Sequence, residues 1–106
     1  MAWVMLIAAG LFETAFAVSL DRSEGFTRVV PTILFAVCAL SSFALLNLAL
    51  RDLPVGTAYA VWTGIGAAGT AIVGMIALGE PANLIRIGAI ALIVAGAVGL
   101  QAVESH

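Results

Sequence analysis

Glu13 is the residue whose position most needs a chemical explanation. It lies near the middle of an apolar stretch, whereas the other five acids fall in polar segments or in the C-terminal tail. A charge at the centre of a bilayer costs at least about 2.5–3.5 kcal/mol, so acids placed there usually face a protein interior or an aqueous cavity and serve in transport. Glu13 is therefore predicted to bind a cation or a proton. The alternative is a permanently protonated Glu13 that only hydrogen-bonds between helices.

The counter-ion of Glu13 must come from outside the protein, because no Arg, Lys or His lies in the interior of the apolar stretches, and Arg86 falls only at the start of the last one. A proton is one candidate, since removal from water disfavours the charged form of a carboxyl group, and a second nearby carboxylate would disfavour it further. A substrate cation is the other candidate. If the two ions compete for one carboxylate, each excludes the other, and exchange of one for the other follows.

Small residues surround Glu13 on its own helical face. Ala9, Gly10, Phe16 and Ala17 lie three or four positions away from Glu13, and three of these four are small. Their size leaves room for a cavity beside the carboxylate.

A second candidate wall of the site lies in the third apolar stretch. Residues spaced three or four apart share a helical face, and here they are Tyr59, Trp62, Thr63, Gly66 and Thr70. Aromatic faces can hold a cation, and the Tyr59 hydroxyl can hydrogen-bond a carboxylate. A role for Trp62 as an anchor at the membrane interface is the competing interpretation, because it lies only a few residues inside the stretch.

Ser42 lies near the middle of the second apolar stretch, on the same face as Cys38. Its hydroxyl either orients the Glu13 side chain or donates a hydrogen bond to a carbonyl of its own helix. Cys38 is the only cysteine, which excludes an internal disulfide and a multi-cysteine metal site. We expect Cys38 to be a small buried apolar residue, and we expect neither a metal nor a cofactor.

Glycine and alanine patterns predict close helix packing. Gly64-Ile65-Gly66-Ala67-Ala68-Gly69 matches the Gly-x-Gly-x-x-Gly dinucleotide pattern, but it follows no strand and has no acid about 20 positions on, so we reject that interpretation. Gly64, Gly66 and Gly69 are instead predicted to allow packing or a bend. Ala91, Ala95 and Gly99 form a small-residue stripe that suits packing within the chain and dimerisation equally well.

The elements that carry these residues are predicted to be four membrane-spanning helices. Of the 106 residues, 63% are hydrophobic and only 9% are charged, too few to coat a soluble globule. Charged clusters divide the chain into spans near the 20 residues that a helix needs to cross a bilayer: 2–20, 29–50, 55–78 and 84–103. Spans this long without alternation disfavour strands. We expect a single all-α integral membrane domain over residues 1–106, rather than a hydrophobic subunit of a soluble complex.

The charge balance excludes a nucleic-acid surface and says little about orientation. Four arginines, no lysine and six acids give a net charge of −2, so no basic patch exists for DNA or RNA. Arg51 lies on one expected side of the membrane, and Arg22, Arg28 and Arg86 lie on or near the other. So weak a bias fits insertion in both orientations, and it also fits a modest preference for one.

Several motifs together resemble the small multidrug resistance transporters over essentially the whole chain. They are the early Glu13, the segment Glu24-Gly25-Phe26-Thr27-Arg28 with Pro31, and the highly specific run from Pro54 to Trp62. Ser42 and the run from Trp62 to Ala67 look more like the guanidinium-exporter branch than the polyaromatic-drug branch.

The resemblance implies a secondary active transporter of the cell membrane, not an enzyme. It implies a proton-coupled antiporter for guanidinium and small substituted guanidiniums, working as an antiparallel homodimer of dual topology in which two copies of Glu13 share one site. Ser42 and Trp62 would hydrogen-bond Glu13, and Tyr59 would gate the site. Guanidinium also suits the site chemically, because it is planar, weakly hydrated and can donate two parallel hydrogen bonds to one carboxylate.

Two departures from the branch pattern leave alternatives open. The branch usually has tryptophan where this chain has Phe16, and lysine where it has Asp21. The first change removes an indole N–H donor near the site. The second changes the charge at the end of the first span and so bears on membrane topology. Topology matters here because some family members work as pairs of unlike chains. A heteromeric pair, a broader quaternary-ammonium or multidrug exporter and a non-transporting membrane subunit are the alternative interpretations.

Overall fold

The computed structural model describes residues 1–104 and contains four helices. They are α1 (Ala2–Arg22), α2 (Val29–Ala49), α3 (Val55–Ala77) and α4 (Leu84–Glu104), and the described residues form no strand. Each helix is long and apolar enough to cross a membrane. The prediction of an all-α, four-helix membrane protein is thereby confirmed.

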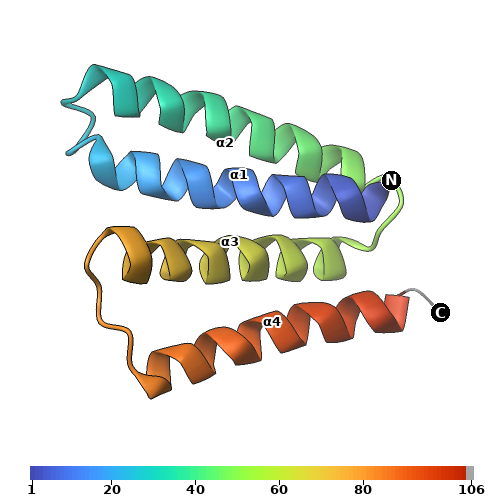
Figure 1. Cartoon of the computed structure of the whole chain (residues 1–106). Coiled ribbons are helices and arrows are strands. Elements are labelled where there is room, and N and C mark those ends of the chain that lie inside the picture. Colours follow the sequence, from blue (N-terminus) through green and yellow to red (C-terminus); the bar gives the residue numbers. More distant parts are fainter. Residues whose placement is uncertain (105–106) are drawn as a thin grey trace.

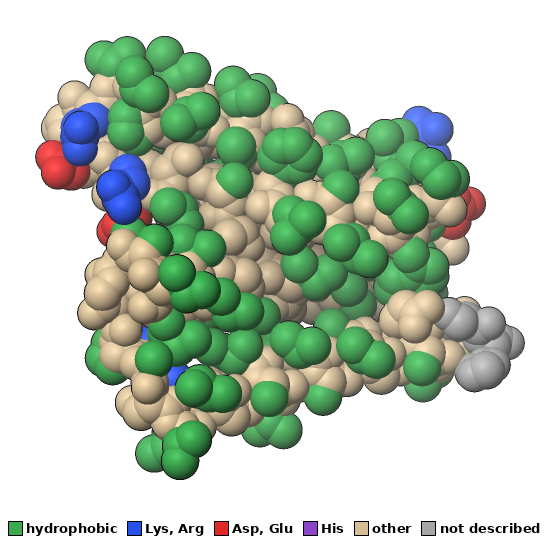
Figure 2. Space-filling view, in the orientation of Figure 1, with side chains coloured by type: hydrophobic (Ala, Val, Ile, Leu, Met, Phe, Trp, Pro, Cys, Tyr) green, Lys and Arg blue, Asp and Glu red, His purple; other side chains and the backbone are tan. Residues whose placement is uncertain are grey.

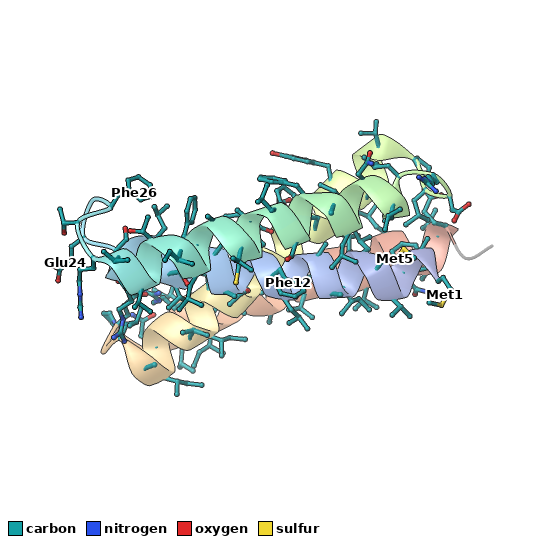
Figure 3. All side chains as sticks on the ribbon, turned by 90° about the horizontal axis from the view of Figure 1, so that it is seen from above. Met1, Met5, Phe12, Glu24 and Phe26 are labelled. Carbon is teal, nitrogen blue, oxygen red and sulfur yellow. The ribbon has the colours of Figure 1, made fainter. Side chains whose placement is uncertain are left out.

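The backbone conformations of a few residues explain where the helices end and the chain turns. Pro54 caps α3 in an extended conformation, which suits its fixed φ and missing N–H. Glu24, Gly25 and Phe26 all have positive φ and reverse the chain between α1 and α2. Glu24 and Phe26 lie at the end of the molecule opposite Met1 (Figure 3). Gly79, at φ +73°, turns the chain after α3.

The helices lie side by side, with α1 between α2 and α3, and with α4 beyond α3 (Figure 1). Successive helices run in opposite directions, so the N-terminus and the end of α4 lie at the same end of the bundle. The molecule measures 45 × 34 × 17 Å, which is close to a single layer of helices. A site between α1 and α3 is therefore open on at least one side of the layer.

The buried core is small and lies where α1, α2 and α3 meet. Its members are Leu6, Ala9, Ala49, Ala58, Val61 and Trp62. No residue of α4 is buried, and α4 packs against α3 alone. Figure 2 shows hydrophobic side chains over the whole visible face and charged groups confined to the ends of the helices. This surface is suited to lipid and to other membrane helices rather than to water.

Two polar contacts lie at opposite ends of the α3–α4 hairpin, one between the two helices and the other between α4 and the segment that connects them. Thr57 Oγ1 donates a hydrogen bond of 2.9 Å to Glu104 Oε1, near the start of α3. At the other end, Arg86 Nη2 lies 2.8 Å from Glu80 Oε1. These contacts hold the ends of the hairpin and leave its apolar middle facing the bilayer.

Candidate functional site

A groove of about 610 Å³ runs along α1 and α3 and carries Glu13. Phe16 and Ala17 of α1 line it together with Thr63 and Gly66 of α3. Further along, the lining includes Asp21 and Glu80, close to the ends of the same two helices. The structure thus brings Glu13 and Phe16 of α1 together with Thr63 and Gly66 of α3 in one groove.

The Glu13 carboxyl group lies in tight surroundings and lacks a partner. Its Oε1 is buried, and no hydrogen-bond partner for this atom exists among the described residues. Gly66 lies directly against it, because a Cβ built at Gly66 would collide with the carboxyl group. Leaving a buried polar atom unsatisfied costs free energy. The arrangement therefore suits a bound proton or cation that supplies the missing interaction.

Ser42 and Trp62 form a polar link across three helices. The Trp62 Nε1–H donates to Ser42 Oγ at 2.9 Å, and Ser42 Oγ donates to the Ala9 carbonyl at 2.7 Å. Both side chains are in the buried interior, and this link joins α3, α2 and α1 at one point. In this single chain Ser42 and Trp62 bond to each other and to Ala9 rather than to Glu13. Their hydrogen bonds to Glu13 stay a prediction.

Aromatic rings form a continuous run that starts at Phe16, which lines the groove. The ring of Phe16 lies 6.0 Å from that of Phe43, Phe43 lies 5.7 Å from Trp62, and Trp62 lies 5.7 Å from Tyr59. Tyr59 is 57% exposed, so a single chain does not enclose its hydroxyl. Phe43 was not among the predicted site residues. Nothing in its sequence context distinguishes it from a lipid-facing side chain.

The predicted glycines make two kinds of helix contact. Gly10, Gly66 and Gly69 lie where α1 and α3 touch, and a Cβ at any of them would collide with a side chain of the opposite helix. Gly64 faces α4 instead, where an added Cβ would make an ordinary contact of 3.5 Å with Ile93. The close approach of α1 to α3 thus depends on glycine at three points.

Thr14 is a polar residue at this contact that the sequence analysis did not single out. Its hydroxyl lies 3.3 Å from the carbonyl oxygen of Gly66 and 3.4 Å from that of Gly10. The signal that could have identified it is a threonine next to the only acid in the middle of a span.

The other predicted features lie away from the groove. Ala91, Ala95 and Gly99 are exposed on α4, so this stripe takes no part in the packing of α4 on α3. Cys38 is only partly buried, against the expectation of a buried residue, because α2 packs mainly against α1 and touches α3 only slightly. Within residues 1–104, no cluster of His, Cys, Asp and Glu could hold a metal ion.

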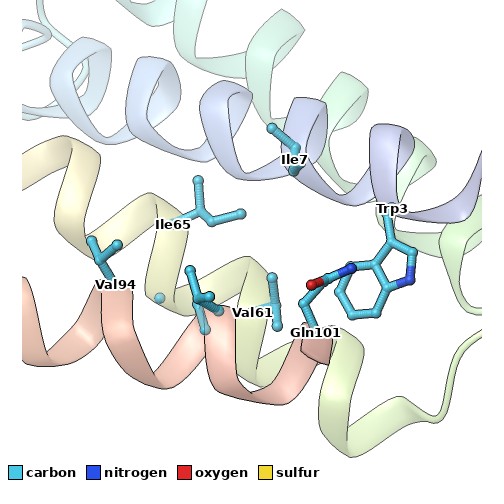
Figure 4. Close-up of a pocket in the computed structure, with 9 residues that line it drawn as sticks. Trp3, Ile7, Val61, Ile65, Val94 and Gln101 are labelled. Carbon is cyan, nitrogen blue, oxygen red and sulfur yellow. The ribbon is translucent and has the colours of Figure 1, made fainter. Parts of the chain in front are cut away.

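A second cavity lies between α1, α3 and α4 and is separate from Glu13. It has a volume of about 190 Å³, and Figure 4 shows Ile7, Val61, Ile65 and Val94 around it, with Trp3 and Gln101 toward one end. Its lining is almost wholly apolar and offers no charged group. It therefore lacks the chemistry to bind an ion.

Comparison with known proteins identifies the family. The family model described as Small Multidrug Resistance protein matches residues 1–93. The chain is 52% identical to a guanidinium exporter of Yersinia pseudotuberculosis over 101 residues, which cover 95% of this chain and 97% of that protein. It is 50% identical to guanidinium exporters of Escherichia coli K12 and Citrobacter freundii, over 95% of this chain and 96% of each relative. With four membrane-spanning helices and these matches along almost its whole length, the chain is a multi-pass membrane protein that belongs to the small multidrug resistance family.

Proposed function

We propose that this protein exports guanidinium across the cell membrane in exchange for protons, with Glu13 as the shared binding group. The observation that carries the proposal is the buried, unpartnered Oε1 of Glu13 in a groove between two membrane-spanning helices. Relatives about half identical to this chain are named guanidinium exporters, which supports guanidinium as the cation.

The chemistry of the groove favours guanidinium over other monovalent cations. A guanidinium ion is planar and can donate two parallel N–H bonds to one carboxylate. It is also weakly hydrated for a cation, so moving it from water into an apolar groove costs less than moving an ammonium ion. Phe16 adds an aromatic face to the groove wall. Cations are attracted to such faces.

Competition at Glu13 couples guanidinium to the proton. Apart from Glu13, the charged residues that line the groove, Asp21 and Glu80, lie toward its end. A protonated Glu13 cannot form the ion pair that holds guanidinium, and a guanidinium ion occupies the oxygens that would take the proton. Each ion therefore leaves before the other binds. Binding of guanidinium should weaken as the pH falls.

A second copy of the chain, inverted in the membrane, completes the site in this proposal. One chain leaves the groove open and α4 without a buried residue. The exposed stripe of Ala91, Ala95 and Gly99 suits close packing against a helix of another subunit. Two copies also supply a second Glu13, and two carboxylates without a fixed counter-ion bind protons as a coupled pair. The sparse arginines of the loops offer little to fix one orientation.

Cysteine labelling tests the inverted pairing. Asp52 is exposed in the connection between α2 and α3 and can be replaced by cysteine in a Cys38→Ala background. A membrane-impermeant maleimide should then label about half of the copies from each side of the membrane, as a two-fold assembly of inverted subunits requires. Labelling of every copy from one side would contradict the antiparallel homodimer and favour pairing with an unlike chain.

Transport by the purified protein in liposomes tests the function itself. Guanidinium outside the liposomes should enter when the interior is acidic, as protons leave in exchange. Tetramethylammonium should be taken up much more slowly, because it has no N–H donors for the carboxylates. Equal uptake of the two cations would contradict a hydrogen-bonding site and support a general exporter of quaternary ammonium compounds. No uptake of either would support a non-transporting subunit.

A further inference from the structure

Two hydroxyl groups tie α1 to its neighbours, and they do so in different ways. Ser42 of α2 is fully buried, and its hydroxyl makes a short bond of 2.7 Å to the carbonyl of Ala9. Thr14 of α1 points to α3, and its hydroxyl is shared between the carbonyls of Gly66 and Gly10 at 3.3 and 3.4 Å. Both distances are long for an O–H···O bond, as expected for one hydrogen between two acceptors.

The position of Thr14 couples it to Glu13 through α3. Glu13 packs against Gly66, and Thr14 packs against Gly69, one turn further along the same helix. A Cβ at Gly69 would collide with the Thr14 hydroxyl group, so this contact has no spare room. Thr14 itself does not line the groove. It can therefore act on the site only by fixing where the backbone of Gly66 lies.

We propose that Thr14 is a positioning residue. Its hydrogen bond to the Gly66 carbonyl holds α3 against Glu13. During transport this bond breaks, and the hydroxyl keeps its hydrogen bond to the Gly10 carbonyl. This inference rests on the proposed function, in which Glu13 releases one ion before it binds the other, and it adds that α3 moves away from Glu13 during this exchange. When α3 moves away, the hydroxyl loses the carbonyl of Gly66. It keeps the carbonyl of Gly10 within its own helix, so no buried donor is left unsatisfied in the apolar interior.

The second acceptor sets the size of the effect. A hydroxyl bonded only to α3 would lose its single hydrogen bond when α3 moves away, which is costly without water nearby. The shared Thr14 hydroxyl loses only its hydrogen bond to Gly66 and keeps the one to Gly10. Interhelical hydrogen bonds measured in membrane proteins are weak, and losing one of average strength corresponds to about a threefold change in rate. Thr14 should therefore slow the opening of the groove about threefold.

The test compares three variants. Thr14→Val keeps the shape of the side chain and removes the hydroxyl, whereas Thr14→Ser keeps the hydroxyl. Thr32→Val is the matched control, because the Thr32 hydroxyl bonds only to the Arg28 carbonyl at the start of α2. Each variant and the wild type are examined for guanidinium affinity by calorimetry, for saturating transport rate in liposomes, and for the ¹³C shift of the Gly66 carbonyl.

The ¹³C chemical shift of the Gly66 carbonyl reports the interhelical hydrogen bond directly and does not depend on transport. Labelling glycine with ¹³C at the carbonyl and alanine with ¹⁵N selects the three Gly–Ala peptide bonds of the chain, after Gly66, Gly88 and Gly96. The Gly66 signal should move in Thr14→Val and stay in place in Thr14→Ser and Thr32→Val. Thr14→Val should also raise the saturating transport rate about threefold and leave guanidinium affinity unchanged. A residue needed only for folding would not raise this rate.

The outcomes separate this inference from the proposed function. An unmoved Gly66 signal in Thr14→Val, or a saturating rate equal to that of the wild type, would overturn the role of Thr14. So would a rate increase that Thr14→Ser or Thr32→Val reproduces. A wild-type protein that neither binds nor moves guanidinium would instead overturn the proposed function, and the carbonyl shift would still decide whether Thr14 joins the helices.

Discussion

Glu13→Gln is expected to reduce proton-driven guanidinium uptake to the level of liposomes that contain no protein. Glutamine matches glutamate in size, so the groove and its contact with Gly66 should persist. The amide carries no charge to pair with guanidinium and cannot take up or release a proton. Uptake of radiolabelled guanidinium into liposomes with an acidic interior measures the effect, and size-exclusion chromatography shows whether the variant is folded.

A matched substitution separates charge at the site from charge in general. Glu24 is an exposed acid in the turn between α1 and α2, and Glu24→Gln removes the same charge without touching the groove. This control should transport at close to the wild-type rate. Retained proton-driven uptake by Glu13→Gln would refute the role assigned to Glu13, whatever the control does.

Gly66→Ala should cause the second-largest loss, because the methyl group would occupy the space that the Glu13 carboxyl group now fills. The carboxyl group would have to swing away from α3. Displacing a reacting or binding group by about 1 Å can cost about 100-fold in activity, so we expect a loss of about 10- to 100-fold in uptake. The initial rate of guanidinium uptake, measured over a range of concentrations, gives the size of this loss.

Gly64→Ala is the matched control for that change. It makes the same substitution two residues away on the same helix, but its methyl group would meet Ile93 of α4 at an ordinary contact distance of 3.5 Å. Intrinsic helix propensity changes equally in both variants. We expect Gly64→Ala to keep most of its transport. Equal losses in the two variants would show that α3 needs glycine for its own flexibility, and the steric account of Gly66 would then be wrong.

The four helices could be predicted from the sequence because the membrane imposes a simple rule. Backbone groups in hydrocarbon must bond within the helix, and so the intervals between charged clusters report the spans. The convergence of Glu13, Phe16, Thr63 and Gly66 could also be predicted in part, since helical spacing places each on a defined face. What spacing does not give is which faces of different helices meet.

The hydrogen bonds that Ser42 and Thr14 donate to other helices could not be predicted because their acceptors are backbone carbonyls. Ser42 bonds to Ala9 and Thr14 bonds to Gly66 through carbonyl groups that every residue carries, so no side chain marks the partner. The aromatic run through Phe43 was missed for a related reason. An aromatic residue in an apolar span looks the same whether it faces lipid, a site or another ring.

The exposure of α4 could not be predicted from the sequence either. A stripe of small residues predicts close helix packing, but it does not say whether the partner belongs to the same chain. In the structure, α3 packs against other residues of α4, among them Ile93 and Ala97, and the stripe is left exposed.

Proton release on guanidinium binding tests most directly the central claim that the two ions compete for Glu13. Guanidinium would be added to purified protein in weakly buffered detergent solution, and the released protons would be counted against the bound cation. One guanidinium ion should displace about two protons from the coupled pair of carboxylates at a pH where both are protonated. Glu13→Gln should release none. Binding of guanidinium to the wild type without proton release, or equal release from Glu13→Gln, would contradict the account.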